Sequence, residues 1–351
     1  MMDGSHPATT GAAYAPVTSC ETSESIQEHM CEMADPMALR LRIVAIRYEA
    51  ETIRSFELAA ADGNLLPSFK PGAHIDLALP GDFSRSYSLT SDGDLPKSYV
   101  IAVNRDASSR GGSAYMCDTA RVGEVITAQS PRNNFGLNED ADQTVFFAGG
   151  IGITPIMSMI RRMEKLSKNW KLIYAARSRA SAAFVEELER FETTNPGHVS
   201  FHFDDEKSSV LPVADLVTAS PADAHLYCCG PAAMISAFKG AAAVRRDDTV
   251  HVEHFSATVE QSSASFVVVL KRSGKEFLVP AGRTIMDVLQ EAGIRVAYSC
   301  REGVCGTCET RVVEGIPDHK DNVLSAREQA SNKLIMICCS GAKSDRLVLD
   351  L

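Results

Sequence analysis

Four cysteines near the carboxyl end of the chain are spaced as ligands of a metal cluster. Cys300, Cys305 and Cys308 follow the pattern C-x4-C-x2-C, and Cys338 comes after 29 intervening residues. Thiolates with this spacing hold plant-type 2Fe–2S centres. Glycines in the same loop permit tight turns that aim backbone amides at sulfur. The sequence therefore predicts a one-electron iron–sulfur centre with these four cysteines as its metal ligands.

A zinc site built on Cys305 and Cys308 is the alternative to the cluster. Zinc modules usually pair two C-x2-C hooks, and a single hook would leave Cys300 without a role. The cluster is therefore the favoured interpretation. Cys339 directly follows Cys338 and is expected to pack in the core.

A glycine-rich turn joins a predicted strand at 144–147 to a predicted helix. Glycine amides at a helix N-terminus form an anion site, which fits the pyrophosphate of a dinucleotide. Thr154 suits the N-cap and Pro155 the first helical position. The turn departs from G-x-G-x-x-G, and glycine turns also serve packing. The predicted nucleotide-binding residues are Gly149, Gly150, Gly152, Thr154 and Pro155.

A second nucleotide element follows a later predicted strand at 226–229. Cys229, Gly230 and Pro231 stand at its carboxyl end, where ligands bind in parallel sheets. Gly230 allows a flat ring to approach the backbone closely. One of the adjacent Cys228 and Cys229 is expected to fill the core, because neighbouring strand residues face opposite ways.

A third group of residues combines a cation with an aromatic ring. Arg85 can bind a phosphate through two of its guanidinium N–H groups. Tyr87 offers a flat aromatic face and a hydroxyl, and the Ser88 hydroxyl can donate a hydrogen bond to a ring heteroatom. A second phosphate seat, before a predicted helix, has backbone amides and a hydroxyl. The alternative for Arg85 is a buried ion pair beside a core tyrosine. The residues of these two segments are Arg85, Ser86, Tyr87 and Ser88, and Arg110, Gly111, Gly112 and Ser113.

The elements that must position these residues change character along the chain. Six short, partly alternating segments between 38 and 138, separated by proline and glycine, predict a small antiparallel barrel. Strands and helices then alternate from 142 to 256, which predicts a parallel sheet with helices on both faces. A polar linker precedes a hairpin at 266–279 and a helix capped by Thr284 and Asp287, with Gly293 at its end.

Composition excludes several classes of function. The chain has 351 residues and a formal net charge of −10, which argues against a protein that binds nucleic acid or an anionic membrane. The mainly apolar, uncharged stretch at 145–160 is too short to span a bilayer and contains three glycines. No signal peptide is evident, and the cysteines are clustered rather than spread as in a disulfide scaffold. The cytoplasm is therefore the expected location.

Taken together, the motifs resemble the phthalate dioxygenase reductase family of the ferredoxin–NADP reductase superfamily. The resemblance spans residues 38–351 and includes the stretch 251–256. It implies FMN at the Arg85 and Arg110 elements, a nicotinamide nucleotide on the glycine turn, and an iron–sulfur centre at the carboxyl end. It also implies that the FMN contacts include Tyr87, Ser88, Ala102, Val103, Asn104, Ser113 and Phe255. The hydride-transfer site would be lined by Ser88, Thr154, Cys229 and Phe255, with no acid–base residue.

Composition and patterning, together with the resemblance, predict a modular organisation, in which the acidic leader has no counterpart in the family. We expect a disordered acidic leader at 1–37, an FMN-binding β-barrel at 38–140, an NAD-binding α/β domain at 141–257, a linker at 258–265 and a ferredoxin domain of α+β (β-grasp) class at 266–351. Arg177 replaces the acidic residue expected beside the ribose 2′-hydroxyl, and arginine there can favour a 2′-phosphate. NADH is nevertheless the expected donor, with NADPH second.

These inferences lead to one functional hypothesis. A nicotinamide donates two electrons at once, a 2Fe–2S cluster takes one, and a flavin can convert between them. The chain is then the reductase component of a Rieske non-haem-iron oxygenase that hydroxylates or demethylates an aromatic compound. Two alternatives stay open: a free-standing reductase for a cytochrome P450 or another soluble acceptor, and a redox-sensing binding protein.

Overall fold

The computed structural model describes residues 1, 38–81, 83–107, 109, 111–255 and 264–351. The predicted leader after Met1, most of the predicted linker, and Arg110 lie outside these ranges. Residues Leu39–Leu351 form one compact unit. None of the helices in the described ranges combines the length and the apolar character needed to cross a bilayer.

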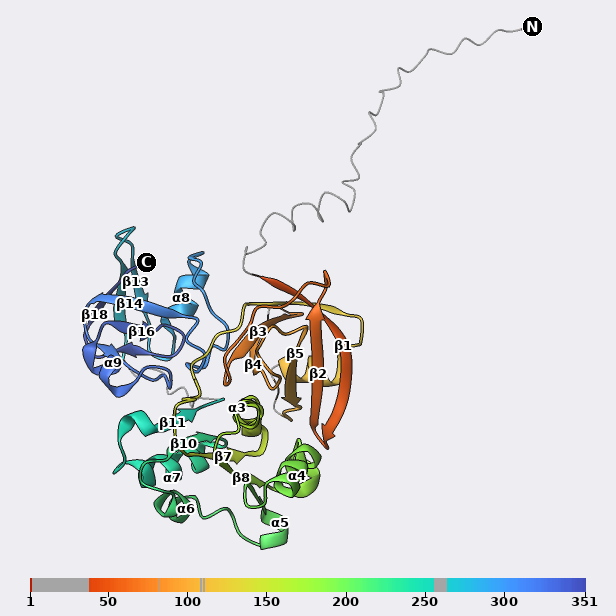
Figure 1. The fold of residues 1–351 in the computed structure, drawn as a ribbon. Coiled ribbons are helices and arrows are strands. Elements are labelled where there is room, and N and C mark those ends of the chain that lie inside the picture. Colours follow the sequence, from red (N-terminus) through yellow and green to blue (C-terminus); the bar gives the residue numbers. More distant parts are fainter. Residues whose placement is uncertain (2–37, 82, 108, 110, 256–263) are drawn as a thin grey trace. The chain divides into compact units, whose positions relative to one another are not determined.

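The first sheet is a six-stranded antiparallel barrel, coloured orange to yellow in Figure 1. Alternation along its strands buries one face: Leu41 and Ile43 are fully buried between exposed Arg40 and Arg42. A bridge between Leu89 and a residue of the last strand in the order closes the sheet on itself. In the order β4-β3-β6-β1-β2-β5, the strands are β1 (Leu39–Ala50), β2 (Ile53–Ala60), β3 (His74–Leu79), β4 (Phe83–Ser88), β5 (Ser98–Asn104) and β6 (Val125–Ala128). The predicted antiparallel barrel is confirmed.

The second sheet has five parallel strands in the order β11-β10-β7-β8-β9. Its strands are β7 (Thr144–Gly149), β8 (Trp170–Ala176), β9 (Val199–Phe203), β10 (His225–Cys229) and β11 (Val250–Glu253). The helices are α3 (Ile153–Lys165), α4 (Val185–Thr194), α5 (Asp204–Lys207), α6 (Val213–Ala219) and α7 (Ala232–Ala242). This confirms the predicted doubly covered parallel sheet.

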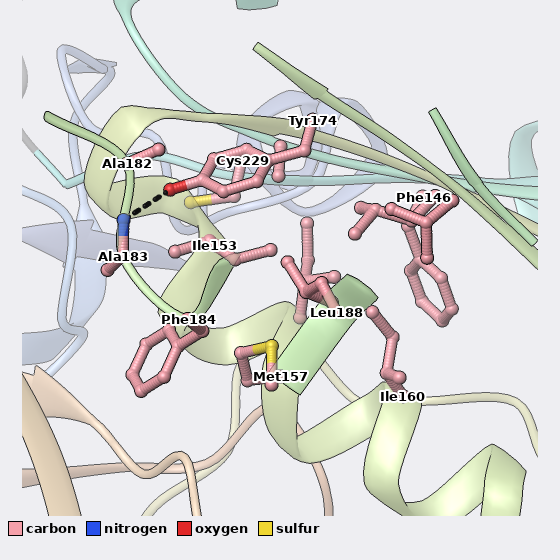
Figure 2. Close-up of a cluster of buried hydrophobic side chains, with 14 of the residues drawn as sticks. Phe146, Ile153, Met157, Ile160, Tyr174, Ala182, Ala183, Phe184, Leu188 and Cys229 are labelled. Carbon is pink, nitrogen blue, oxygen red and sulfur yellow. Dashed lines mark hydrogen bonds between the residues drawn. The ribbon is translucent and has the colours of Figure 1, made fainter. Parts of the chain in front are cut away.

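Alternate residues of β7 serve the two faces of this sheet. Phe146 packs with the buried side of α3, whereas Phe147 packs with α7 through Phe238. Figure 2 shows Ile153, Met157 and Ile160 of α3 directed into the first of these cores. Because three residues of one helical face are buried there, α3 is fixed against the sheet that it follows.

The third sheet is mixed, in the order β13-β12-β18-β14-β16. The predicted hairpin and the capping box of Thr284 with Asp287 are both present, and Gly293 has the positive φ (74°) of a residue just past a helix end. The elements are β12 (Phe266–Leu270), β13 (Glu276–Val279), α8 (Ile285–Glu291), β14 (Glu309–Glu314), β15 (Pro317–Asp318), α9 (Ala326–Ser331), β16 (Leu334–Met336), β17 (Gly341–Ala342) and β18 (Arg346–Leu349). The cysteine loop leads from α8 to β14.

Candidate functional site

A cavity of about 320 Å³ collects residues from all three predicted modules. Twelve predicted site residues line it: Arg85, Ser86, Tyr87, Ser88, Ala102, Val103, Asn104, Ser113, Thr154, Phe255, Cys300 and Cys305. The barrel supplies eight of these, the parallel-sheet region two and the cysteine loop two. Residues expected to contact a flavin, a nicotinamide and an iron–sulfur centre therefore line one cavity, which is partly open to solvent.

Strand β4 presents its residues to the cavity because it is held firmly against β3. Ser86 pairs with Asp76, and Ser88 pairs with His74. The Ser86 hydroxyl donates to Asp76 Oδ1 at 2.5 Å, and the buried Asp76 also forms an ion pair with Arg132. The Ser86 hydroxyl thus bonds within the barrel, and its oxygen also lies 3.4 Å from Ser299 Oγ. The Ser88 hydroxyl has no such partner within the part of the chain that the structure describes.

The two predicted phosphate seats lie against each other. A Cβ at Gly112 would come within 2.6 Å of Arg85 Cγ, so that only glycine lets the arginine side chain cross the start of the short helix α2 (Gly112–Ala114). The Ser109 hydroxyl accepts from the N–H groups of Gly111 (3.2 Å) and Ala114 (3.3 Å). Backbone amides here already gather around an oxygen atom, as a phosphate would require.

Glycines also bring the two predicted nucleotide elements into contact. A Cβ at Gly152 would lie 2.2 Å from the carbonyl oxygen of Cys229, and one at Gly149 would lie 2.6 Å from Pro231 Cδ. Gly230 is equally crowded, with Gly149 Cα 3.1 Å from its ideal Cβ. The missing side chains allow the ends of β7 and β10 to approach, which leaves backbone amides open at the carboxyl edge of the sheet.

The prediction that Thr154 caps the helix and Pro155 opens it is wrong. A 3-10 turn over 150–152 tightens the chain, so that α3 begins at Ile153 with Gly152 as its N-cap. Thr154 is already inside the helix, where its hydroxyl donates to the Ile151 carbonyl at 2.9 Å. The side chains of Ile151 and Thr154 both face the cavity.

Two buried polar atoms on the cavity wall lack a hydrogen-bond partner within the described residues. They are His74 Nε2 and Glu253 Oε2. Burial lowers the pKa of His74 to about 4 and raises the pKa of Glu253 to about 8. Both groups are therefore uncharged at neutral pH. An unpartnered imidazole nitrogen and a protonated carboxyl suit a bound ring with donors and acceptors at its edge.

The cysteine loop has the donor chemistry of a cluster site. Cys300, Cys305, Cys308 and Cys338 are all buried and all free thiols. The N–H of Glu302 donates to Cys300 Sγ at 3.3 Å, and Thr307 Oγ1 lies 3.1 Å from Cys305 Sγ. Arg301, Gly303 and Gly306 have positive φ angles that turn amides toward sulfur. These residues fit a cluster held by thiolates.

The thiols influence one another electrostatically. The neighbouring Cys300 thiol and burial raise the pKa of Cys305, and Cys300 itself interacts with both Cys305 and Cys338. Within the ranges described, no three His, Cys, Asp or Glu side chains converge as tightly as a single metal ion demands. Cys339 packs in the core next to Gly303, as expected; a Cβ at Gly303 would lie 2.5 Å from its sulfur.

The remaining predicted residues lie outside the cavity wall. The predicted residues that do not line it are Gly111, Gly112, Gly149, Gly150, Gly152, Pro155, Cys229, Gly230, Pro231, Cys308 and Cys338. Arg177 is exposed directly after β8. Lining residues that the sequence did not indicate are His74, Asp106, Ser109, Glu302 and Val304. Ile151 belongs to the glycine turn, and Glu253 and His254 precede Phe255 in the stretch 251–256, where the sequence assigns them no chemical role. His74 could have been found only by aligning its strand with the strand that carries Ser88, because the two residues are paired across β3 and β4.

Two family models match the chain. The model described as an oxidoreductase NAD-binding domain matches residues 146–240. The model described as a 2Fe-2S iron-sulfur cluster binding domain matches residues 268–343. Together they cover most of the parallel sheet with its glycine turns and most of the sheet that carries the cysteine loop. They favour the iron–sulfur interpretation over zinc.

Similar proteins extend the match across almost the whole chain. The phenoxybenzoate dioxygenase subunit beta of Ectopseudomonas oleovorans is 46% identical over 326 residues, which cover 92% of this chain and all of that protein. The structure of phthalate dioxygenase reductase, described as a modular structure for electron transfer from pyridine nucleotides to 2Fe-2S, aligns at 38% identity with a TM-score of 0.68. That alignment covers 90% of this chain and 98% of the other.

A third similar structure is an intact type IV self-sufficient cytochrome P450 monooxygenase. It aligns at 35% identity with a TM-score of 0.81, and the alignment covers 94% of this chain and 44% of that one. The family models agree with the expected nicotinamide nucleotide and 2Fe–2S cluster, and FMN stays a prediction. The chain belongs to the phthalate dioxygenase reductase family, and it is an oxidoreductase that transfers electrons from a pyridine nucleotide to an iron–sulfur cluster.

Proposed function

We propose that the protein is the reductase component of a Rieske non-haem-iron oxygenase that hydroxylates or demethylates an aromatic compound. The observation that carries this proposal is the single cavity lined by barrel, nucleotide and cysteine-loop residues. The relatives named above include a subunit of a phenoxybenzoate dioxygenase and a phthalate dioxygenase reductase, which supports an oxygenase as the acceptor.

The proposal places FMN in the cavity and gives the FMN-binding barrel the bounds 38–140. Arg85, Ser113 and the amides near Gly111 would hold its phosphate, and Arg110 is assigned the same role from the sequence. Tyr87, Ser88, Ala102, Val103 and Asn104 would line the ring, which Phe255 would cover. When bound, FMN supplies the conversion from a two-electron donor to single electrons.

The proposal assigns NADH to the range 141–257. The amides of Gly149, Gly150 and Gly152 would bind its pyrophosphate, and Cys229, Gly230 and Pro231 would flank its nicotinamide. Thr154 enters the cavity from the first turn of α3 and would orient that ring. Arg177 would meet the adenosine ribose, where it can accept a 2′-phosphate.

The range 266–351 would hold the cluster through Cys300, Cys305, Cys308 and Cys338. The cysteine loop is docked on the barrel through polar contacts: Ser299 Oγ lies 3.0 Å from Ser84 Oγ, and Asn134 Nδ2 donates to the Cys305 carbonyl at 3.1 Å. Because Cys300 and Cys305 border the flavin cavity, no separate movement of this region is needed for the internal transfer of an electron.

The acidic chain would meet a basic patch on the oxygenase, and the reduced, clustered thiols fit a cytoplasmic location. A cytochrome P450 acceptor is the second candidate. The strong structural match to a self-sufficient P450 monooxygenase favours it, because a closely similar reductase region occurs within that chain.

Rapid mixing of the NADH-reduced protein with each type of acceptor tests the proposal. A purified Rieske oxygenase and a purified P450 are each mixed anaerobically with it, and their own absorbance changes are followed at several salt concentrations. We expect fast, salt-sensitive reduction of the oxygenase and slow reduction of the P450. The opposite order of rates would assign the chain to a P450 system.

A further inference from the structure

Helix α3 carries a continuous polar stripe that the nucleotide-binding role leaves unexplained. Thr154, Ser158, Arg161, Arg162 and Lys165 recur three and four residues apart, so that they share one side of the helix. The neighbouring face, with Ile153, Met157 and Ile160, is buried in the sheet (Figure 2). A charged stripe of this kind is ordinarily solvated, but here every member has a partner.

The middle of the stripe contacts the barrel backbone beside the cavity. The Ser158 hydroxyl accepts from the N–H of Gly72 at 3.0 Å in a buried position, and Arg161 donates to the carbonyl of Thr90. Arg161 also forms a two-point contact with Glu187 of α4, at 2.7 and 2.8 Å. The helix is therefore tied both to its own sheet and to the barrel.

The carboxyl end of the stripe contacts an acidic barrel loop. Lys165 Nζ lies 2.9 Å from Asp92 and 2.8 Å from Asp94, and Arg162 donates to Asp94 at 3.1 Å. Arg162 also binds both oxygens of Glu139, at 2.9 and 3.0 Å. Two cations and three carboxylates thus form one network, which is stronger than separate surface pairs.

The barrel segments held in this way lead directly to the cavity wall. Gly72 precedes His74 by two residues, and Thr90 follows Ser88 by two residues. His74 and Ser88 are paired across β3 and β4, and both line the cavity. At its other end the same helix places Thr154 in the cavity, about 16 Å from Lys165 along the helix axis.

We propose that the polar stripe of α3 is a positioning device that sets the nicotinamide-binding turn at a fixed distance from the flavin-binding strand. Ser158, Arg161, Arg162 and Lys165 are positioning residues, since they touch neither cofactor site. The inference rests on the proposed function, because it concerns the geometry of electron transfer between nicotinamide and flavin. A displacement of one ångström at such a site costs up to about a hundredfold in rate.

The test removes the barrel side of the network and leaves the nucleotide-binding region untouched. In the double variant Asp92→Asn/Asp94→Asn of the full-length protein, flavin reduction is followed by anaerobic stopped flow over a range of NADH concentrations. We expect the limiting rate constant to fall about tenfold, while the NADH dissociation constant and the flavin content stay as in the wild type. The long-wavelength absorbance of the nicotinamide–flavin complex should weaken in parallel.

Two matched variants separate positioning from a general loss of stability. Asp62→Asn removes an exposed barrel carboxylate that accepts hydrogen bonds from Asn64, and flavin reduction in this variant should proceed at the wild-type rate. Asp92→Glu/Asp94→Glu keeps both charges and should restore most of the rate. Arg162→Gln removes the opposite side of the same network and should repeat the loss of rate.

The outcomes distinguish this inference from the proposed function. If NADH fails to bleach the flavin of the wild-type protein, the proposed function itself is wrong. If the wild type is reduced rapidly and both the double variant and Arg162→Gln match it, the positioning role of α3 is overturned. A lower flavin content with an unchanged rate per bound flavin would also overturn it, since the stripe would then only stabilise the fold.

Discussion

Substitution of Glu253 should change how the stability of the protein depends on pH. Oε2 of this side chain is shielded from solvent without a hydrogen-bond partner among the described residues, and burial raises the pKa to about 8 from an ordinary value of 4.5. The folded state therefore holds a proton that the unfolded chain releases above pH 4.5. The contribution of this group to the free energy of unfolding is fully present below pH 4.5, and it is lost progressively as the pH rises to 8.

The size of the effect follows from the same difference in pKa. Raising the pKa from 4.5 to about 8 amounts to about 5 kcal/mol in full, of which about 4 kcal/mol is lost between pH 5 and pH 8. Glu253→Gln replaces the protonated carboxyl with a neutral group of the same shape. At pH 8 the variant should have a thermal midpoint roughly 6 °C above that of the wild type, and at pH 5 the two should nearly agree.

Thermal denaturation of the holoprotein from pH 5 to pH 9 measures this difference. Infrared difference spectra provide a direct check, because the band of the protonated carboxyl should disappear near pH 8 in the wild type and be absent from the variant. Glu186→Gln, at an exposed position in the first turn of α4, is the control and should follow the wild type. Parallel profiles for the wild type and Glu253→Gln would refute the argument from burial.

Three further substitutions test the assigned sites. Gly152→Ala puts a Cβ 2.2 Å from a facing carbonyl oxygen, which should lower the free energy of unfolding by about 1–3 kcal/mol. It should also raise the KM for NADH in steady-state assays. The control Gly240→Ala, where the Cβ would have nothing within 4 Å, should leave this KM unchanged. Cys338→Ser should abolish the iron and sulfide content and Cys339→Ser should retain both; the reverse result would exchange the ligand assignment. Arg177→Asp should shift the ratio of kcat/KM for NADPH and NADH toward NADH by at least about tenfold, and an unchanged ratio would exclude contact with the 2′-phosphate.

Much of the architecture was predictable because it depends on local patterns. The alternation of Leu41 and Ile43 with exposed arginines predicts a half-buried strand, and the Thr284–Asp287 pair predicts a helix start. The cysteine spacing likewise predicts the loop, since the ligands lie close together in the chain. Each of these signals is contained within a few consecutive residues.

The errors and omissions arise where distant segments meet. Thr154 looked like an N-cap because the sequence does not reveal that a tight turn over 150–152 makes the helix begin two residues earlier. Glu253 appeared unremarkable because its pKa depends on burial by residues from other elements. The stripe of Arg161 and Lys165 looks solvated in sequence, since its partners lie in the barrel about 70 residues earlier.

An anaerobic NADH titration followed by visible absorbance tests the central claim most directly. The account predicts uptake of about three electrons per chain, two on the flavin and one on the cluster, with the iron–sulfur absorbance bleaching together with the flavin absorbance. Identification of the released flavin as FMN completes the measurement. Uptake of only two electrons, with no bleaching of iron–sulfur absorbance, would contradict electron transfer from the nicotinamide to a cluster in this chain.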